Sequence, residues 1–150
     1  MATQKIPPLV VGEKILSVDP GGTTGIAFIV YQGGREFELR YVTQLAWVER
    51  FTLNAYMQHA DRIVCEDFKL YESKAKEQIN SRFPSVQVIG ILECYAYQMG
   101  MLHKVYYQMA SERVNVTVAN SEHKKALQTM VHATDAYRHA RLHVLMNRAR

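Results

Sequence analysis

The feature that most constrains the fold is the segment KILSVDPGGTTGIAFIV, residues 14–30, in which two apolar runs flank a turn rich in glycine and threonine. The runs predict two neighbouring β-strands, Lys14–Asp19 and Thr24–Tyr31, joined by a turn whose glycines permit backbone angles that other residues avoid. The first strand therefore ends at a carboxylate, Asp19, held at the edge of a sheet. Such a placement suits a metal ligand, although a hairpin with a purely structural turn uses the same residue types.

The remaining apolar patterns predict a third strand at 36–44, a helix at 46–59, a fourth strand at 62–67, a helix at 84–99, a fifth strand at 104–108 and a last helix at 132–147. A continued helix competes for 104–108, and residues 110–130 show little pattern beyond a short helix that Asn120 would cap. This order fits an α/β fold with a mixed sheet flanked by helices. We expect residues 1–13 to be a flexible lead-in and residues 14–150 to form a single domain.

Composition narrows the class of protein. The chain has 150 residues, of which 48% are hydrophobic and 21% charged, as in a globular domain with a substantial core. The net charge of +4 weakly favours a polyanionic partner. The sequence lacks a long apolar run and a signal-peptide core, so we expect a cytoplasmic protein without a membrane partner. Cys65 and Cys94 lie among apolar residues and are interpreted as buried free thiols rather than a disulfide. They do not form a CxxC pair, so a structural zinc site is not expected.

Three carboxylates stand beside apolar strands or helices. Asp19 ends the first strand, Glu66 ends the fourth, and Asp135 lies in the first turns of the last helix, three residues after His132. Positions i and i+3 share a helix face, so His132 and Asp135 can converge on one point. Mg²⁺ and Mn²⁺ prefer hard oxygen ligands, with an occasional imidazole for Mn²⁺. Each residue also has an ordinary structural explanation, as a solvated acid, a helix-start residue or a helix-dipole partner. His139 continues the same helix face and is either a group that supports the ligands or, more commonly for such a position, a packing histidine.

Taken in order, the motifs ILSVDPGGTTG (15–25), IVCE (63–66) and HATDA (132–136) resemble those of the RuvC-like Holliday-junction resolvases, particularly the phage-type members, within the RNase H-like nuclease superfamily. The resemblance spans roughly residues 14–145. It implies a five-stranded mixed sheet with helices on both faces. It also implies a metal-dependent endonuclease that acts as a homodimer on four-way junctions and other branched DNA, in recombination or repair.

The resemblance also assigns roles to residues. It matches Asp19, Glu66 and Asp135 to the family's metal-binding carboxylates, and places His132 where some members have Asp and others His. It implies two Mg²⁺ or Mn²⁺ ions per active site and no nucleotide cofactor. A His at position 132 removes one negative charge, which would shift the preferred metal from Mg²⁺ towards Mn²⁺.

Basic and aromatic residues supply candidate DNA contacts. The polar stretch 69–82 follows the fourth strand and is either a DNA-facing loop or a solvated loop; a lysine before the last helix and an arginine on it are further candidates. The complete set of candidates is Lys69, Tyr71, Lys74, Lys76, Arg82, Lys124, Lys125 and Arg138. The helix at 84–99 is apolar around much of its circumference, which suits either the core or a dimer interface.

Three other functions remain open at this stage. The first motif also resembles the phosphate loop of the sugar-kinase, actin and heat-shock ATPases, but those proteins need two such domains with the nucleotide between them. A non-catalytic branched-DNA-binding protein of the same fold would differ in lacking metal-dependent turnover. An RNase H acting on RNA–DNA hybrids would share the metal chemistry and differ only in substrate preference.

Overall fold

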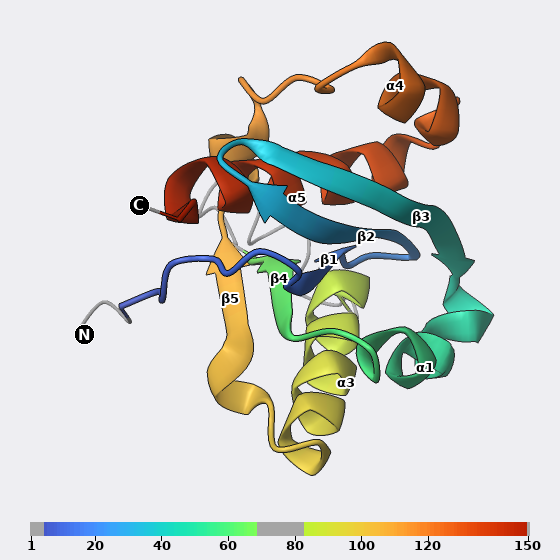
Figure 1. Ribbon diagram of the computed structural model, residues 1–150. Helices are drawn as coiled ribbons and strands as arrows, with labels where there is room; N and C mark the ends of the chain where they lie inside the picture. Colours follow the sequence, from blue (N-terminus) through green and yellow to red (C-terminus); the bar gives the residue numbers. More distant parts are fainter. Residues whose placement is uncertain (1–4, 69–82, 150) are drawn as a thin grey trace.

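The computed structural model describes residues 5–68 and 83–149 and contains one five-stranded sheet with helices on both faces (Figure 1). The strand order is β3-β2-β1-β4-β5. The strands are β1 (Lys14–Asp19), β2 (Thr23–Gly33), β3 (Glu36–Ala46), β4 (Arg62–Glu66) and β5 (Val105–Gln108). The predicted α/β fold with a mixed sheet is confirmed, as is β5, for which a continued helix competed.

The register of the strands brings two carboxylates to one edge of the sheet. β1 and β4 are parallel, with Val18 opposite Cys65, so the residues that follow, Asp19 and Glu66, end neighbouring strands. β2 begins and β3 ends at the same edge, because both pairings are antiparallel and Gly25 lies opposite both Asp19 and Gln44. We call this border of the sheet the acidic edge.

Alternating side chains of the strands divide the core into two layers. One layer lies under η1 (Trp47–Thr52), α1 (Leu53–Met57) and α3 (Pro84–Gln98), and the other lies under α5 (Val131–Asn147) (Figure 1). In β1, Leu16 and Val18 face the first layer and Ile15 faces the second. β1 and β4 are apolar on both faces, as expected of central strands covered on both sides. Helix α5 packs through small residues, which let its backbone approach the sheet: Ala133, Ala136 and Ala140.

Several elements differ in detail from the prediction. The helix expected at 46–59 is a 3₁₀ helix followed by a short α-helix, and β3 extends two residues beyond its predicted end to Ala46. Between β5 and α5 the chain forms η3 (Ala110–Arg113) and α4 (Ser121–Leu127). Asn120 caps α4 as predicted, since its Oδ1 accepts from the His123 amide at 2.8 Å. The short η2 (Leu102–Lys104) leads into β5.

The N-terminal segment is held against the domain where the structure describes it. Leu9 is buried, and its amide donates to the Asn147 carbonyl at 2.7 Å. Arg62, at the start of β4, forms two hydrogen bonds with Glu13, at 2.6 and 2.8 Å. The segment expected to be a flexible lead-in therefore contacts the rest of the domain from Pro7 onwards.

Two other expectations concern the thiols and the membrane. Both cysteines are free as predicted, and Cys65 is buried, but the predicted burial of Cys94 was wrong, because its position on α3 leaves it exposed. Among the described residues, every helix is too short or too polar to cross a membrane.

Candidate active site

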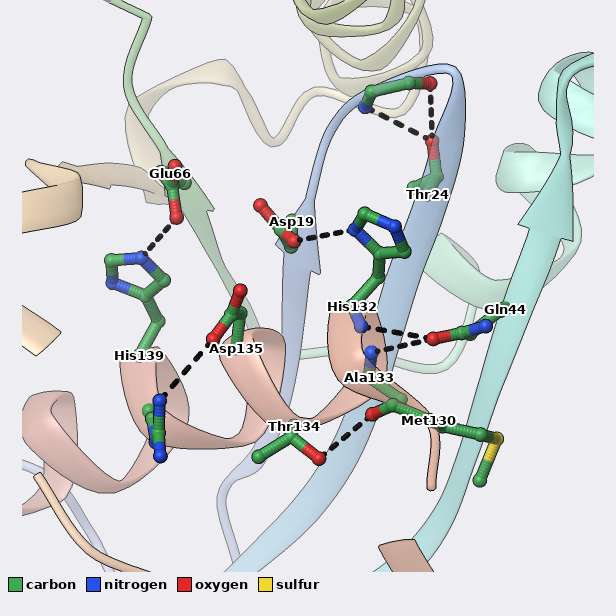
Figure 2. Close-up of polar contacts among 12 residues, drawn as sticks. Asp19, Thr24, Gln44, Glu66, Met130, His132, Ala133, Thr134, Asp135 and His139 are labelled. Atoms are coloured by element: carbon green, nitrogen blue, oxygen red, sulfur yellow. Dashed lines mark hydrogen bonds and ion pairs between the residues drawn. The ribbon is translucent and has the colours of Figure 1, made fainter. Parts of the chain in front are cut away.

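The turn after Asp19 is braced by a threonine. The Thr24 hydroxyl donates to the Gly21 carbonyl at 3.3 Å, and the Gly21 amide approaches the same hydroxyl oxygen at 3.5 Å (Figure 2). Together the two contacts close a small ring within the glycine-rich segment that the sequence predicts to be a turn. These contacts connect the turn that follows Asp19 to the start of β2.

The start of α5 is fixed by two residues of the sheet. Gln44 of β3 accepts hydrogen bonds at its Oε1 from the amides of His132 and Ala133, at 2.9 and 3.2 Å (Figure 2). Amides in the first turn of a helix have no partner within the helix, and Gln44 supplies one. Gly25 of β2 lets the start of α5 lie this close to the sheet, because a Cβ at position 25 would lie 1.9 Å from the His132 carbonyl oxygen. The glycine is thus required for close approach of helix and sheet.

Helix α5 directs three side chains towards the acidic edge. Nδ1 of His132 lies 3.5 Å from Oδ2 of Asp19. One turn along the helix Asp135 points to the same region, and His139, one turn further, donates from Nε2 to Glu66 Oε2 at 2.8 Å (Figure 2). The structure therefore brings together the predicted Asp19, Glu66, His132 and Asp135, from β1, β4 and α5.

His139 is more closely involved than a packing residue. Its side chain is completely buried, with Nδ1 2.7 Å from Oε1 of Gln108 at the end of β5. A histidine held on one side by an amide and bonded on the other to a carboxylate fixes the orientation of that carboxylate. The spacing of four residues from Asp135 was the only sequence signal for this role, and it suits ordinary packing equally well.

Sequence reasoning missed Arg113. This residue ends η3, and its Nε donates to Glu66 Oε2 at 2.9 Å, while Nη2 lies 3.3 Å from Asp135 Oδ2. One guanidinium therefore joins carboxylates from β4 and α5. Arg138, predicted as a DNA contact, lies beside the same acid, with Nη1 3.5 Å from Asp135 Oδ1.

The acids of the site are in different electrostatic states. Burial, followed by the negative charges of Glu66 and Asp135, raises the pKa of Asp19 from 3.8 to about 8. Burial also acts to raise the pKa of Glu66, but hydrogen bonds from His139 and Arg113 outweigh it and hold that pKa below its usual value. Without a metal, burial and the neighbouring charges thus favour the protonated form of Asp19, whereas the donors around Glu66 favour its charged form.

These donors suit a hard divalent cation. The site offers carboxylate oxygens from three elements and the imidazole of His132, a set that Mg²⁺ or Mn²⁺ accepts. Burial and, after it, the crowding of the carboxylates raise the pKa of Asp19, and a cation bound there would replace the proton that they favour. Among the described residues, however, no three such side chains already surround one metal position. Arg113 lies between two of the carboxylates instead.

A small pocket of about 130 Å³ opens beside Glu66. It lies between the turn after β1, the end of β4, the first turn of α3 and the start of η3; the residues that line it with Glu66 are Pro20, Asp67, Phe68, Ser85, Met109 and Ala110. The carboxylate of Glu66 is therefore reachable from outside the domain.

The remaining candidate DNA contacts lie elsewhere. Lys124 and Lys125 are exposed on α4. Among the described residues, neither lysine forms a hydrogen bond or ion pair with the carboxylates of the site. Five further candidates lie outside the described residues: Lys69, Tyr71, Lys74, Lys76 and Arg82.

Comparison with known proteins identifies a solved structure with the same fold. No family model matches the sequence, and no curated protein matches it in sequence. Among solved structures, RuvC of T. thermophilus in complex with a Holliday junction substrate superposes with a TM-score of 0.62, covering 89% of this chain and 94% of that one. The chain has a RuvC-like fold. The two sequences are 13% identical, so what they share is the fold. The protease–reverse transcriptase of prototype foamy virus also matches, at 9% identity over 89% of this chain and 22% of that one, but its TM-score of 0.35 is too low for inference.

Proposed function

We propose that this protein is a metal-dependent endonuclease that cleaves Holliday junctions and other branched DNA. The observation that carries the proposal is the convergence of Asp19, Glu66 and Asp135 at one edge of a RuvC-like fold. Carboxylates from three separate elements, gathered although they repel one another, indicate a site built for a cation. The similar RuvC structure holds a Holliday junction substrate, which supports branched DNA as the substrate class.

The side chains have distinct proposed roles. Asp19, Glu66, Asp135 and His132 would hold two Mg²⁺ or Mn²⁺ ions, which when bound activate a water and stabilise the leaving 3′-oxygen of the cleaved phosphodiester. Asp19 would release its proton to water on becoming a ligand, and the products would carry 5′-phosphate and 3′-hydroxyl ends. His139 keeps the carboxylate of Glu66 oriented through its 2.8 Å hydrogen bond.

Paired cuts across a junction require two active sites, so we also propose a homodimer. Helix α3 supports this proposal. It buries Val88 and Leu92 in the core but leaves Val86 and Tyr97 exposed, at 46% and 75%. Light scattering of the purified protein tests the proposal, and a monomeric mass at the concentrations that support paired nicking contradicts it.

The deciding experiment uses labelled four-way junction, flap, linear duplex and RNA–DNA hybrid, each with Mg²⁺, Mn²⁺ or EDTA. We expect paired nicks on the junction that require the metal and disappear in Asp19→Asn. Junction binding in Ca²⁺ is the control, because it shows that the variant is folded and still binds DNA. Tight binding by the wild type without cleavage in either metal would identify a binding protein instead. Preferred cleavage of the hybrid would identify an RNase H.

A further inference from the structure

Arg113 is placed where the proposed metal ions would act. Its guanidinium donates from Nε to Glu66 Oε2 and lies with Nη2 3.3 Å from Asp135 Oδ2, so it joins two proposed metal ligands with adjacent nitrogens. Oε2 of Glu66 also accepts a hydrogen bond from Nε2 of His139. Two donors therefore already occupy the lone pairs of this oxygen.

A guanidinium and a divalent ion compete for the same oxygens. A metal ion needs the lone pairs of its carboxylate ligands directed at itself, and it repels a neighbouring positive charge. The side chain of Arg113 is 20% exposed and comes from η3, a short element at the surface. Because Arg113 reaches the acids from outside β4 and α5, we expect that rotation of its side chain releases them without movement of either element.

We propose that Arg113 is the counter-cation of the metal-free site, and that a divalent metal ion displaces it from Glu66 and Asp135. This inference rests on the proposed function, since it assumes that the acids are metal ligands, and it adds a step before catalysis. Metal binding and the two Arg113 ion pairs exclude each other. Binding of the metal thus frees a positive charge at the acidic edge.

The direct test follows the Nε–H group of Arg113 by NMR while Mg²⁺ is added to the full-length protein without DNA. The signal is assigned by its absence in Arg113→Lys. In the metal-free protein we expect slow exchange with water, because Nε–H is bonded to Glu66. As metal occupancy rises, this protection should fall in parallel. Arg62 is an internal control, since its Nε–H donates to Glu13 at the opposite edge of the sheet and should not respond.

A second test measures Mn²⁺ affinity by calorimetry. Arg113→Gln removes the competitor, so Mn²⁺ should bind about tenfold more tightly or better than in wild type. Arg138→Gln is the matched control, because it also removes one positive charge beside Asp135. That charge lies 3.5 Å from a single carboxylate oxygen, so its loss should change the Mn²⁺ affinity less. Equal tightening in both variants would indicate a general charge effect and overturn the displacement.

The outcomes separate this inference from the proposed function. Saturating metal with an unchanged Arg113 signal overturns the displacement and leaves the nuclease proposal intact. Displacement of Arg113 without junction cleavage supports the inference and refutes the nuclease. If neither wild type nor Arg113→Gln binds Mg²⁺ or Mn²⁺, both proposals fail.

Discussion

Replacing Asp19 with asparagine should stabilise the metal-free protein at alkaline pH. In the folded state burial and two neighbouring acids raise the pKa of Asp19 from 3.8 to about 8, whereas the unfolded chain has the ordinary value. Between these values the folded protein retains a proton that the unfolded chain has lost. The stability contributed by this group is therefore fully present below about pH 4 and is lost as the pH rises to about 8.

The size of the effect follows from the shift. About four pKa units correspond to an upper limit of about 6 kcal/mol at pH 8.5, at about 1.4 kcal/mol per unit. Relaxation of the site and entry of water lower this cost, and we expect Asp19→Asn to be more stable than wild type by about 2 kcal/mol at that pH. Below pH 4 both side chains are neutral, and the difference should disappear apart from a constant offset.

Denaturant unfolding in EDTA measures this difference from pH 4 to 8.5. Glu66 titrates in both proteins and has the opposite pH dependence, because its pKa is lowered, so its contribution largely cancels in the comparison. Added Mg²⁺ should stabilise the wild type at pH 8 and have little effect on the variant. The reasoning would be refuted if the stability difference between the two proteins stayed constant with pH, or if the wild type became more stable relative to the variant as the pH rises.

Two substitutions, each paired with a control variant, test how α5 is positioned. Gly25→Ala should cost about 3 kcal/mol, because the new Cβ would overlap the carbonyl of His132, whereas Gly22→Ala, with open space around its Cβ, should cost less than about 1 kcal/mol in thermal unfolding. Gln44→Leu removes the acceptor of two amides and should lower the free energy of unfolding by about 1 kcal/mol, and it should slow junction cleavage more than it weakens junction binding. Gln44→Glu keeps an acceptor and should retain the stability of the wild type. Equal costs within either pair would show that the contact is unimportant.

The carboxylates of the site were predictable from sequence because each lies at the end of a regular pattern. Asp19 and Glu66 both follow aliphatic runs, and neighbouring parallel strands bring such ends to the same edge. Asp135 lies in the first turns of α5, which begins at Val131, one residue before the predicted start. A strand end or a helix start fixes the location of a side chain as soon as the order of elements is known.

The partners of these acids were not predictable for equally specific reasons. Arg113 lies in a segment without periodicity, and it reaches Glu66 only because the chain turns back across the acidic edge after β5. Gln44 looks like an ordinary strand residue until the register places it over the start of α5. Both contacts depend on tertiary placement, which local patterns do not encode.

Positions and charges at the acidic edge are controlled by different means. The backbone positions are set by the β1–β4 register, by the close approach at Gly25 and by the cap from Gln44, and these contacts involve no cation. Charge, in contrast, is balanced by a long side chain from η3 and by a proton on Asp19, both of which can leave. It follows that metal binding should alter backbone amide signals in η3 strongly, whereas in α5 the change should be confined to the neighbourhood of the proposed ligands His132 and Asp135. A large response along the rest of α5 would mean that the helix moves as the site fills, and that the edge is not preformed.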